Sequence, residues 1–353
     1  MSSRTPVARR SKSLSAQIGL TERLFVSAGE RALAARIEDG LEEVEQGLLQ
    51  RVTFDDSFAD VTSRYLLAAG GKRVRPLLTL LTAQLGEGIT TEVLLAAEAV
   101  EITHLASLYH DDVMDEAEQR RGVPSAQTVW GNSVAILTGD LLFARASKLI
   151  ASIDGSSAVT QTETFERLVL GQLHETIGPQ RGEDPVEHYL QVLRDKTGSL
   201  IAAAAEWGAT FSHAPEEYRQ PLAQFGERIG VAFQLVDDVI DLAPQEAHTG
   251  KIAGTDLRAG VPTLPLLYLR RRALTEPADE ALLLRIDQGV DGADDRVLES
   301  AIADLRAHDV TAETTAEAHR WAADAVGALD ALPEGAVKRA LVRFADLLVD
   351  RSS

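Results

Sequence analysis

Hydrophobic positions recur at the period of an α-helix along nearly the whole chain. Over residues 28–50, one face of the expected helix is apolar and the opposite face is charged. The apolar face holds Leu33, Ile37, Leu41, Val44 and Leu48. The same periodicity predicts helices over residues 90–116, 132–152, 157–178, 186–211, 216–242, 276–288, 294–307, 311–330 and 334–350. Alternating runs of valine, isoleucine and threonine, which mark strands, are scarce. We therefore predict an all-α fold.

Glycine and proline gather at places that we expect to be loops, namely Gly70–Gly71, Gly122–Pro124, Pro179–Pro185 and Pro244–Pro265. None of them has the composition of a flexible linker between domains. The 353 residues are enough for one large core. We expect a single domain over residues 23–353, preceded by a disordered basic arm over residues 1–22.

Composition narrows the function classes. The net charge of −19 argues against nucleic-acid binding, and an anionic substrate would have to meet local clusters of lysine and arginine. The chain has no cysteine, which excludes disulfides, thiolate metal sites and thiol nucleophiles. No apolar run is long enough to span a membrane, and no signal peptide is visible, so we expect a cytoplasmic protein.

Two groups of aspartates share the spacing DDxxD, one in each of two predicted helices: Asp111, Asp112 and Asp115, then Asp237, Asp238 and Asp241. The first and last aspartates of a group lie one helical turn apart on the same face, where they repel each other. A hard cation such as Mg²⁺ would compensate for this repulsion, and it prefers a few carboxylates together with substrate phosphate oxygens. The second group lies in a strongly apolar helix, where unpaired charges are costly. Two such groups predict a site for several Mg²⁺ ions and a diphosphate.

Basic residues accompany both groups: Lys72 and Arg75 in GGKRVRP, Arg120 and Arg121 after the first group, Lys196 beside Thr197, and Lys251 in a glycine-rich loop. Each of these alone fits a solvated turn or the end of a helix equally well. Together they supply cations for two anionic ligands.

In this order the motifs resemble those of the trans-isoprenyl diphosphate synthase (polyprenyl synthetase) family. The matching segments between residues 60 and 270 are GGKRVRP, H-x6-DDVMDEAEQRRG, KT, QLVDDVID and GK-x-x-G-x-DL followed by PTLP. The resemblance implies an isoprenoid synthase-like bundle of long helices around a deep central cavity, usually in a homodimer. It also implies a Mg²⁺-dependent prenyltransferase that adds isopentenyl diphosphate head to tail (1′-4) to an allylic diphosphate.

The resemblance also assigns roles to single positions. Asp111 and Asp115 would bind two Mg²⁺ ions and Asp237 a third, with support from Asp112, Asp238 and Asp241, and catalysis would depend on these ligands and on Lys196. The residues that would bind isopentenyl diphosphate are Lys72, Arg75, His104 and Arg121. Those that would bind the allylic diphosphate are Arg120, Lys196, Thr197, Gln234 and Lys251.

The chemistry of the reaction suits these residue types. An allylic carbon–oxygen bond ionises to a carbocation, and Mg²⁺ with fixed lysine and arginine groups stabilises the charge on the departing diphosphate. The carbocation then needs a dry apolar wall, because water would quench it. The departing diphosphate is the expected base, so we assign no general base to the protein.

Small residues precede Asp111 on the helix face along which a growing chain would pass. They are Ser107, Ala106 and Thr103, which lie four, five and eight positions before it. An aromatic side chain four or five positions before Asp111 would block the tunnel, whereas small ones leave room, although they also permit close packing of helices. We predict a long product, heptaprenyl to decaprenyl diphosphate, of the kind used for quinone side chains, with transient membrane contact for its release. Val261 stands near a position where short-chain relatives carry lysine, which also weakens the case for a short product.

The motifs also allow other products and functions. A geranylgeranyl or shorter product is the nearest one. A class I terpene cyclase also ionises allylic diphosphates. Such cyclases have no counterpart of the pair Lys72 and Arg75, and they do not carry a second DDxxD. A di-iron carboxylate bundle needs two ExxH motifs, and this chain shows one, at Glu101 to His104. A non-catalytic subunit of a heterodimer would have lost the metal motifs that are present here.

Overall fold

The computed structural model describes residue 21 and residues 23–153, 157–243, 253–290, 292 and 295–350. The predicted basic arm over residues 1–22 lies outside the described residues, apart from Thr21. Lys251 also lies outside them. Contacts divide the chain into two compact units that are interleaved in sequence. Unit 1 comprises residues up to Phe165, Leu200–Ala223 and Ala331–Arg343, and unit 2 comprises Glu166–Ser199, Gln224–Asp330 and residues from Phe344 onward. The single domain over residues 23–353 therefore stays a prediction.

Helices dominate the described residues, so the all-α prediction is confirmed. The elements up to residue 165 are η1 (Ala28–Glu30), α2 (Arg31–Arg51), α3 (Ser57–Ala68), α4 (Val74–Thr82), η2 (Ala83–Leu85), α5 (Thr91–Met114), β1 (Gln119–Arg120), β2 (Val123–Pro124), α6 (Ala126–Trp130), α7 (Asn132–Ile153) and the start of α8 (Ser157–Ile177). The later elements are α9 (Pro185–Leu193), the π-helical turn η3 (Arg194–Gly198), α10 (Ser199–Phe211), η4 (Glu216–Tyr218), α11 (Arg219–Asp241), α12 (Thr255–Arg258), α13 (Leu264–Arg272), α14 (Pro277–Val290), α15 (Asp295–Ala307), α16 (Asp309–Ala328), η5 (Leu329–Ala331) and α17 (Ala336–Val349).

Side chains at the helix starts explain several of these boundaries. The carboxylate of Asp56 accepts hydrogen bonds from the first backbone N–H groups of α3, at 3.0 and 2.8 Å. Thr90 accepts a bond of 3.2 Å from the N–H of Val93 at the start of α5. Asp184 caps α9, whose first residue is Pro185. Such caps satisfy donors that have no partner within the helix.

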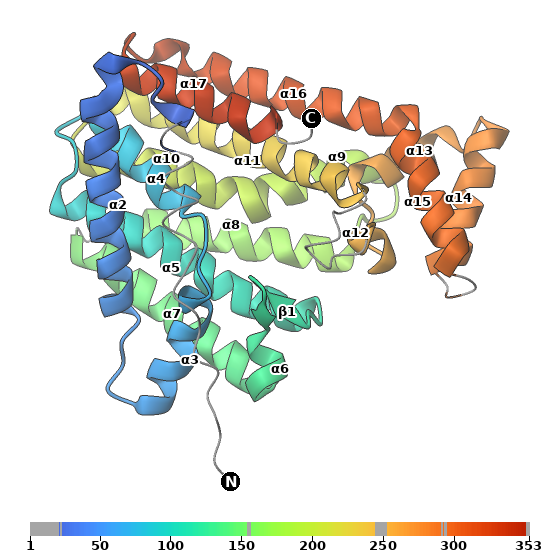
Figure 1. Cartoon of the computed structure of the whole chain (residues 1–353), viewed down its shortest axis with the longest axis horizontal. Helices are drawn as coiled ribbons and strands as arrows, with labels where there is room; N and C mark the ends of the chain where they lie inside the picture. Colours follow the sequence, from blue (N-terminus) through green and yellow to red (C-terminus); the bar gives the residue numbers. More distant parts are fainter. Residues whose placement is uncertain are drawn as a thin grey trace. The chain divides into compact units, whose positions relative to one another are not determined.

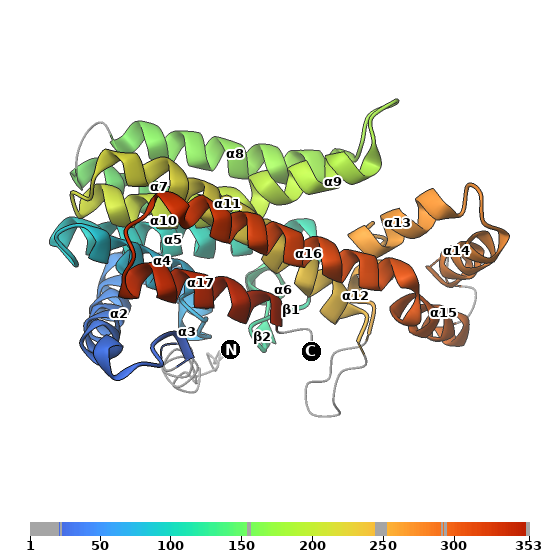
Figure 2. The same ribbon diagram turned by 90° about the horizontal axis from the view of Figure 1, so that it is seen from above.

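In unit 1, α7 runs along α5, as both views show (Figure 1, Figure 2). Glycine permits this close contact, because a Cβ at Gly139 of α7 would lie 2.3 Å from Nε2 of His110 on α5. A second tight contact joins α4 and α10, where a Cβ at Gly208 would lie 2.1 Å from the carbonyl oxygen of Thr79. The hydroxyl of Thr79 in turn donates a 2.9 Å bond to the carbonyl oxygen of Ala204. These contacts pack α5 against α7 and α4 against α10 within unit 1.

In unit 2, a hydrophobic core joins the end of α11 to the helices that follow it. Leu242, Leu257 and Leu269 belong to this core, together with apolar residues of α14 and α15. The helices α14 and α15 form an antiparallel hairpin (Figure 1) in which a Cβ at Gly289 would lie 2.6 Å from the Cβ of Leu298. The core anchors the C-terminal end of the helix that carries the second aspartate group.

Two departures from the predicted elements concern the site. The predicted helix over 186–211 is interrupted by the π-helical turn η3, which contains Lys196 and Thr197. The predicted loop over Pro244–Pro265 contains the short helix α12. Within the part of the chain that the structure describes, no helix is both long and apolar enough to cross a membrane.

Candidate active site

The first aspartate group lies at the C-terminal end of α5, and its three members differ in exposure. Asp112 is buried, Asp111 is partly exposed and Asp115 is exposed. The helix ends at Met114, but the N–H of Asp115 still bonds to the carbonyl oxygen of Asp111 at 2.8 Å, so the helical path continues to Asp115. Asp111 and Asp115 therefore follow one another along the same edge of the helix end, as the spacing predicts.

Arg120 holds the buried member of this group. Its Nε donates a hydrogen bond of 2.6 Å to Oδ1 of Asp112. Oδ2 of Asp112 is buried and meets no hydrogen-bond partner among the described residues. Burial raises the pKa of Asp112, although the neighbouring Arg120 opposes the rise. In this structure the predicted diphosphate ligand Arg120 thus stabilises the acidic group itself.

A small hairpin carries the two arginines after α5. Gln119 pairs with Pro124 and Arg120 with Val123, and Arg121 (φ 55°) and Gly122 (φ 76°) form the turn between the strands. The guanidinium of Arg121 donates to the carbonyl oxygens of Leu66, at 2.9 Å, and of Gly70. The structure therefore brings Arg121 to the GGKRVRP segment, as a shared anion site requires.

A cluster of positive charge surrounds His104 beside this turn. Nε of Arg75 is buried without a hydrogen-bond partner in the described part of the chain. Burial and the nearby Arg121 lower the pKa of Arg75 to about 10, against an attraction from Glu101. Burial, Arg75 and Arg121 hold the pKa of His104 well below its ordinary value, so the imidazole is neutral. The cluster is arranged for an anion that offers several oxygens.

Arg73 is a member of GGKRVRP for which the sequence predicted no role. It takes a left-handed conformation (φ 49°) just before α4, and its side chain is buried. It forms ion pairs with Glu45 at 2.8 Å and Glu101 at 3.1 Å. Arg73 therefore fixes the turn to α2 and α5, while Lys72 beside it is exposed. In this turn the buried Arg73 therefore has a structural role, whereas the exposed Lys72 is accessible from the solvent.

The second aspartate group lies near the end of α11 in unit 2 and repeats the burial pattern of the first. Asp238 is buried, whereas Asp237 and Asp241 are partly exposed. The hydroxyl of Tyr189 donates a 2.7 Å bond to Oδ2 of Asp238, and the backbone N–H of Leu264 donates another at 3.4 Å. Burial nevertheless raises the pKa of Asp238 to about 8. Asp238 is thus a buried carboxyl held by hydrogen bonds within the protein, and its supporting role at a metal site stays a prediction.

Asp241 also has a structural role, because it connects α11 to α12. Its carboxylate accepts hydrogen bonds from the N–H groups of Thr255 at 3.2 Å and Asp256 at 3.1 Å. Its carbonyl oxygen accepts a bond of 2.8 Å from the N–H of Gly254, which has a φ of 71°. Asp241 therefore fixes the start of α12 to the end of α11.

The π-helical turn η3 presents Lys196 and Thr197, and such turns are frequent at functional sites. Lys196 forms an ion pair with Glu175 of α8. The hydroxyl of Thr197 lies 3.5 Å from Oε1 of Gln234, one helical turn before the second aspartate group. The structure thus brings Thr197 to Gln234, which precedes Asp237 by one turn of α11, and the roles assigned to these residues stay predictions.

Two contacts outside the predicted residues hold this turn. A Cβ at Gly171 of α8 would lie 2.4 Å from the backbone nitrogen of Lys196, so only glycine fits there. Arg167 bonds to Asp195 at 2.9 Å and to Glu227 of α11 at 2.7 Å. No sequence pattern indicates Gly171, Arg167, Glu175 or Tyr189, because their roles depend on contacts between helices distant in sequence.

The donor set suits Mg²⁺ bound together with a diphosphate. In both groups the first aspartate is accessible, while the second is buried and bonded within the protein. In the described residues no group of three or more carboxylates or imidazoles is arranged to hold a metal ion by itself. Since Mg²⁺ readily combines one or two carboxylates with substrate phosphates, the accessible Asp111 and Asp115 of unit 1 fit such a site, and so does the accessible Asp237 of unit 2 on its own.

The predicted tunnel wall on α5 is buried. Ala106 and Thr103 have no exposed surface, and Ser107 is 8% exposed. On the facing helix α7, Leu142 is fully buried, and the ring of Phe143 lies between His110 and Phe165, with ring centroids 5.5 and 4.3 Å apart. Both small side chains and aromatic rings therefore lie on the inner faces of α5, α7 and α8.

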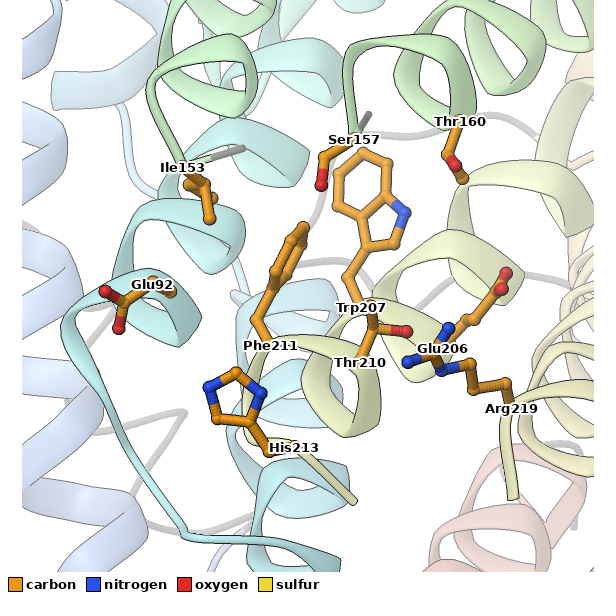
Figure 3. A pocket seen from close by; sticks show the side chains of 10 residues that line it. All are labelled: Glu92, Ile153, Ser157, Thr160, Glu206, Trp207, Thr210, Phe211, His213 and Arg219. Carbon is orange, nitrogen blue, oxygen red and sulfur yellow. The ribbon is translucent and has the colours of Figure 1, made fainter. Parts of the chain in front are cut away.

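A pocket of about 550 Å³ lies at the opposite, N-terminal end of α5. Its lining includes Glu92, Ile153 and Ser157, and Figure 3 shows the rings of Trp207 and Phe211 side by side, pointing toward Ser157. From Glu92 to Asp111, α5 advances about 28 Å at 1.5 Å per residue. The pocket is therefore remote from the first aspartate group.

Comparison with known proteins gives consistent similarities. The family model "Polyprenyl synthetase" matches residues 58–305. The chain is 41% identical to nonaprenyl diphosphate synthase of Mycobacterium tuberculosis over 92% of this chain and 96% of that one. It is similar to the crystal structure of geranylgeranyl pyrophosphate synthase from Corynebacterium glutamicum complexed with calcium and isoprenyl diphosphate (TM-score 0.80, 41% identity, 93% and 99% coverage). A decaprenyl diphosphate synthase from Rhodobacter capsulatus is also similar (TM-score 0.81, 32% identity, 94% and 99% coverage).

Proposed function

The chain belongs to the polyprenyl synthetase family, and on this basis we propose that it is a long-chain trans-polyprenyl diphosphate synthase. The reaction is the sequential 1′-4 condensation of isopentenyl diphosphate onto an allylic diphosphate. Polyprenyl synthetases are Mg²⁺-dependent prenyltransferases that use these two substrates. The number of Mg²⁺ ions, two or three for each active site, is part of the proposal.

The positive cluster beside the first aspartate group carries the proposal. Arg75 keeps a buried donor without a partner among the described residues, and Arg121 lies close enough to lower its pKa. Leaving a buried charged donor unsatisfied is costly, so the arrangement favours an anion that completes its hydrogen bonds. We assign isopentenyl diphosphate to Arg75, Arg121, Lys72 and the neutral His104, which donates one ring N–H.

The allylic diphosphate is assigned to Lys196, Thr197 and Gln234, with Arg120 and Lys251 as further ligands. Lys196 must leave Glu175 to reach a phosphate oxygen, and the nearby Thr197 and Gln234 supply neutral polar contacts. We assign Mg²⁺ to Asp111 and Asp115 and, separately, to Asp237, where the metal would stabilise negative charge on a leaving diphosphate. The protein's own part is to orient the two substrates and to exclude water from the allylic carbon.

The buried small residues of α5 support a long product. Ala106, Ser107 and Thr103 leave the face below Asp111 without a bulky side chain. We therefore propose heptaprenyl to decaprenyl diphosphate, a chain suited to quinones, which would leave the enzyme during a transient membrane contact. Geranylgeranyl diphosphate is the second candidate product, because the geranylgeranyl pyrophosphate synthase from Corynebacterium glutamicum is also 41% identical to this chain.

We further propose a homodimer that forms through α6 and α7. Three large apolar side chains on these helices are exposed in the single chain: Val129 (37%), Ile136 (42%) and Leu137 (65%). Burying them against a second copy would recover hydrophobic free energy. Sedimentation velocity of the wild type and of Leu137→Glu tests this, since the proposal requires a dimer for the first protein and weakened association for the second.

The reaction itself is tested with purified protein, Mg²⁺, radiolabelled isopentenyl diphosphate and farnesyl or geranylgeranyl diphosphate. The proposal predicts Mg²⁺-dependent transfer of label into lipid, followed by a product ladder that ends at heptaprenyl to decaprenyl length after removal of the diphosphate. A cyclised hydrocarbon formed without consumption of isopentenyl diphosphate would instead support the terpene cyclase.

A further inference from the structure

A cation–π contact joins α16 to the first residue of the π-helical turn η3 in unit 2. The guanidinium carbon of Arg194 lies 4.9 Å from the centre of the Trp321 ring. Arg194 is the residue at which η3 begins, and Lys196 and Thr197 follow it within the same turn. A cation over the face of an indole ring is attracted by the negative charge of the π system. The contact therefore ties the start of η3 to a helix that is distant in sequence.

The N–H group of Trp321 does not account for a tryptophan at this position. Nε1 of Trp321 is buried and donates to none of the described residues. A buried N–H without an acceptor lowers stability, and a leucine or phenylalanine would avoid this cost. Packing alone would therefore favour a side chain without that donor. The face of the ring, which meets Arg194, is the feature that explains the tryptophan.

Arg194 is in turn bonded to the other side chains at the start of η3. Its Nη1 donates a hydrogen bond of 3.2 Å to Oε1 of Gln191 on α9, and Nε2 of Gln191 donates one of 2.7 Å to Oδ2 of Asp195. Asp195, the second residue of η3, also accepts a bond of 2.9 Å from Arg167 of α8. The two residues before Lys196 are thus held by contacts with α8, α9 and α16.

We propose that Trp321 is a positioning residue for the allylic diphosphate site. The inference rests on the proposed function, in which Lys196 and Thr197 bind that diphosphate. Because the π-helix is a rare conformation, contacts with neighbouring helices have to stabilise it. Trp321 acts through Arg194, since fixing Arg194 fixes the backbone that carries Lys196 and Thr197. The diphosphate then meets ligands that are already ordered, so its binding loses less conformational entropy.

Hydrogen–deuterium exchange tests this anchoring independently of activity. Trp321→Leu removes the face of the ring, whereas Trp321→Phe keeps an aromatic face and loses the unsatisfied N–H. We expect the backbone amides of residues 194–198 to exchange about fivefold faster in Trp321→Leu than in the wild type. Trp321→Phe should restore most of the protection. Wild-type exchange in Trp321→Leu would overturn the proposal.

Steady-state kinetics test the consequence for substrate binding. In Trp321→Leu we expect KM for the allylic diphosphate to rise about fivefold, while KM for isopentenyl diphosphate and kcat stay near their wild-type values. Arg194→Gln, which removes the charge over the ring, should have the same effect. Because the two side chains act through one contact, the double variant should be scarcely worse than either single one. Equal rises in both KM values, or effects that multiply in full in the double variant, would contradict the positioning role.

His319→Ala is the matched control, because His319 is an exposed residue of α16 two positions before Trp321. It should behave as the wild type in both experiments. Circular dichroism establishes that each variant is folded, and Arg194→Gln carries the test if Trp321→Leu does not fold. A wild type that incorporates no isopentenyl diphosphate would overturn the proposed function, whereas the exchange experiment would still decide whether Trp321 holds η3.

Discussion

Tyr189 of α9 donates a hydrogen bond of 2.7 Å to Asp238, a buried carboxyl in the second aspartate group. Asp238 is thereby held inside the protein, while its neighbour Asp237 remains partly exposed. The same division occurs in the first group, where Arg120 binds the buried Asp112. In both groups a buried aspartate fixes the end of the helix, and the aspartate before it is accessible.

Replacing Tyr189 by phenylalanine should therefore lower activity without changing the shape of the interior. The variant keeps the ring but leaves Asp238 without its side-chain donor, so we expect kcat/KM to fall about tenfold. Steady-state kinetics with the allylic substrate varied measure the effect. Tyr218→Phe in η4 is the control and should behave as the wild type, and equal rates for both variants would show that the Tyr189 bond has no role in catalysis.

Sequence periodicity predicted the long helices well, because α2, α5, α7 and α8 have a clear apolar stripe or a long apolar run. The DDxxD spacing also placed Asp111 and Asp237 on accessible helix positions. It gave no sign of Tyr189 or Glu175, since each contacts a helix far away in sequence. The π-helical turn at Lys196 was missed for a related reason, because apolar residues continue at a helical period on both sides of it.

Gly171→Ala should disturb Lys196 although neither substrate touches Gly171. The new methyl group would lie 2.4 Å from the backbone nitrogen of Lys196, so the π-helical turn must shift. We expect KM for the allylic diphosphate to rise by about tenfold. The control is Gly327→Ala in α16, where no atom of the described chain outside that helix lies within 4 Å of the new group. A KM that is the same in both variants would show that Gly171 does not position Lys196.

Glu30 provides a test of stability against pH. It is buried between Arg339 and Arg343 of α17, at 3.2 and 2.9 Å. Burial alone would raise the pKa of Glu30, but its hydrogen bonds, first with Arg343, lower it to about 2. The pKa of Glu30 is lower in the folded protein than in the unfolded chain. The ion pairs of Glu30 therefore stabilise the protein above pH 4.5, and this stabilisation is lost as the pH falls toward 2.

Chemical denaturation of the wild type and Glu30→Gln should therefore show a difference in unfolding free energy of about 2–3 kcal/mol near pH 7. The difference should shrink as the solution is acidified below pH 4.5. A difference that stays constant down to the lowest pH at which the protein is folded would contradict this assignment.

Ala106→Phe tests whether the growing chain passes along α5. Ala106 has no exposed surface, and on the proposed path of the chain a phenyl group at this position would block it. We expect shorter products with turnover retained for the first condensation, measured by chromatography of the dephosphorylated lipids. Ala99→Val, a smaller change on the same helix, controls for general disturbance of α5. Unchanged product length in Ala106→Phe would place the tunnel elsewhere.

The central proposal is that both aspartate groups are needed for the same Mg²⁺-dependent step. A double-mutant cycle tests it by measuring the initial rate of isopentenyl diphosphate incorporation for wild type, Asp111→Ala, Asp237→Ala and the double variant. Asp287→Ala, at an exposed position of α14, is the control and should keep the wild-type rate. If the groups work as a unit, each single substitution lowers the rate by orders of magnitude, and the double variant is scarcely worse than either one. Near-normal rates in a single variant, or losses that multiply in full, would contradict the account.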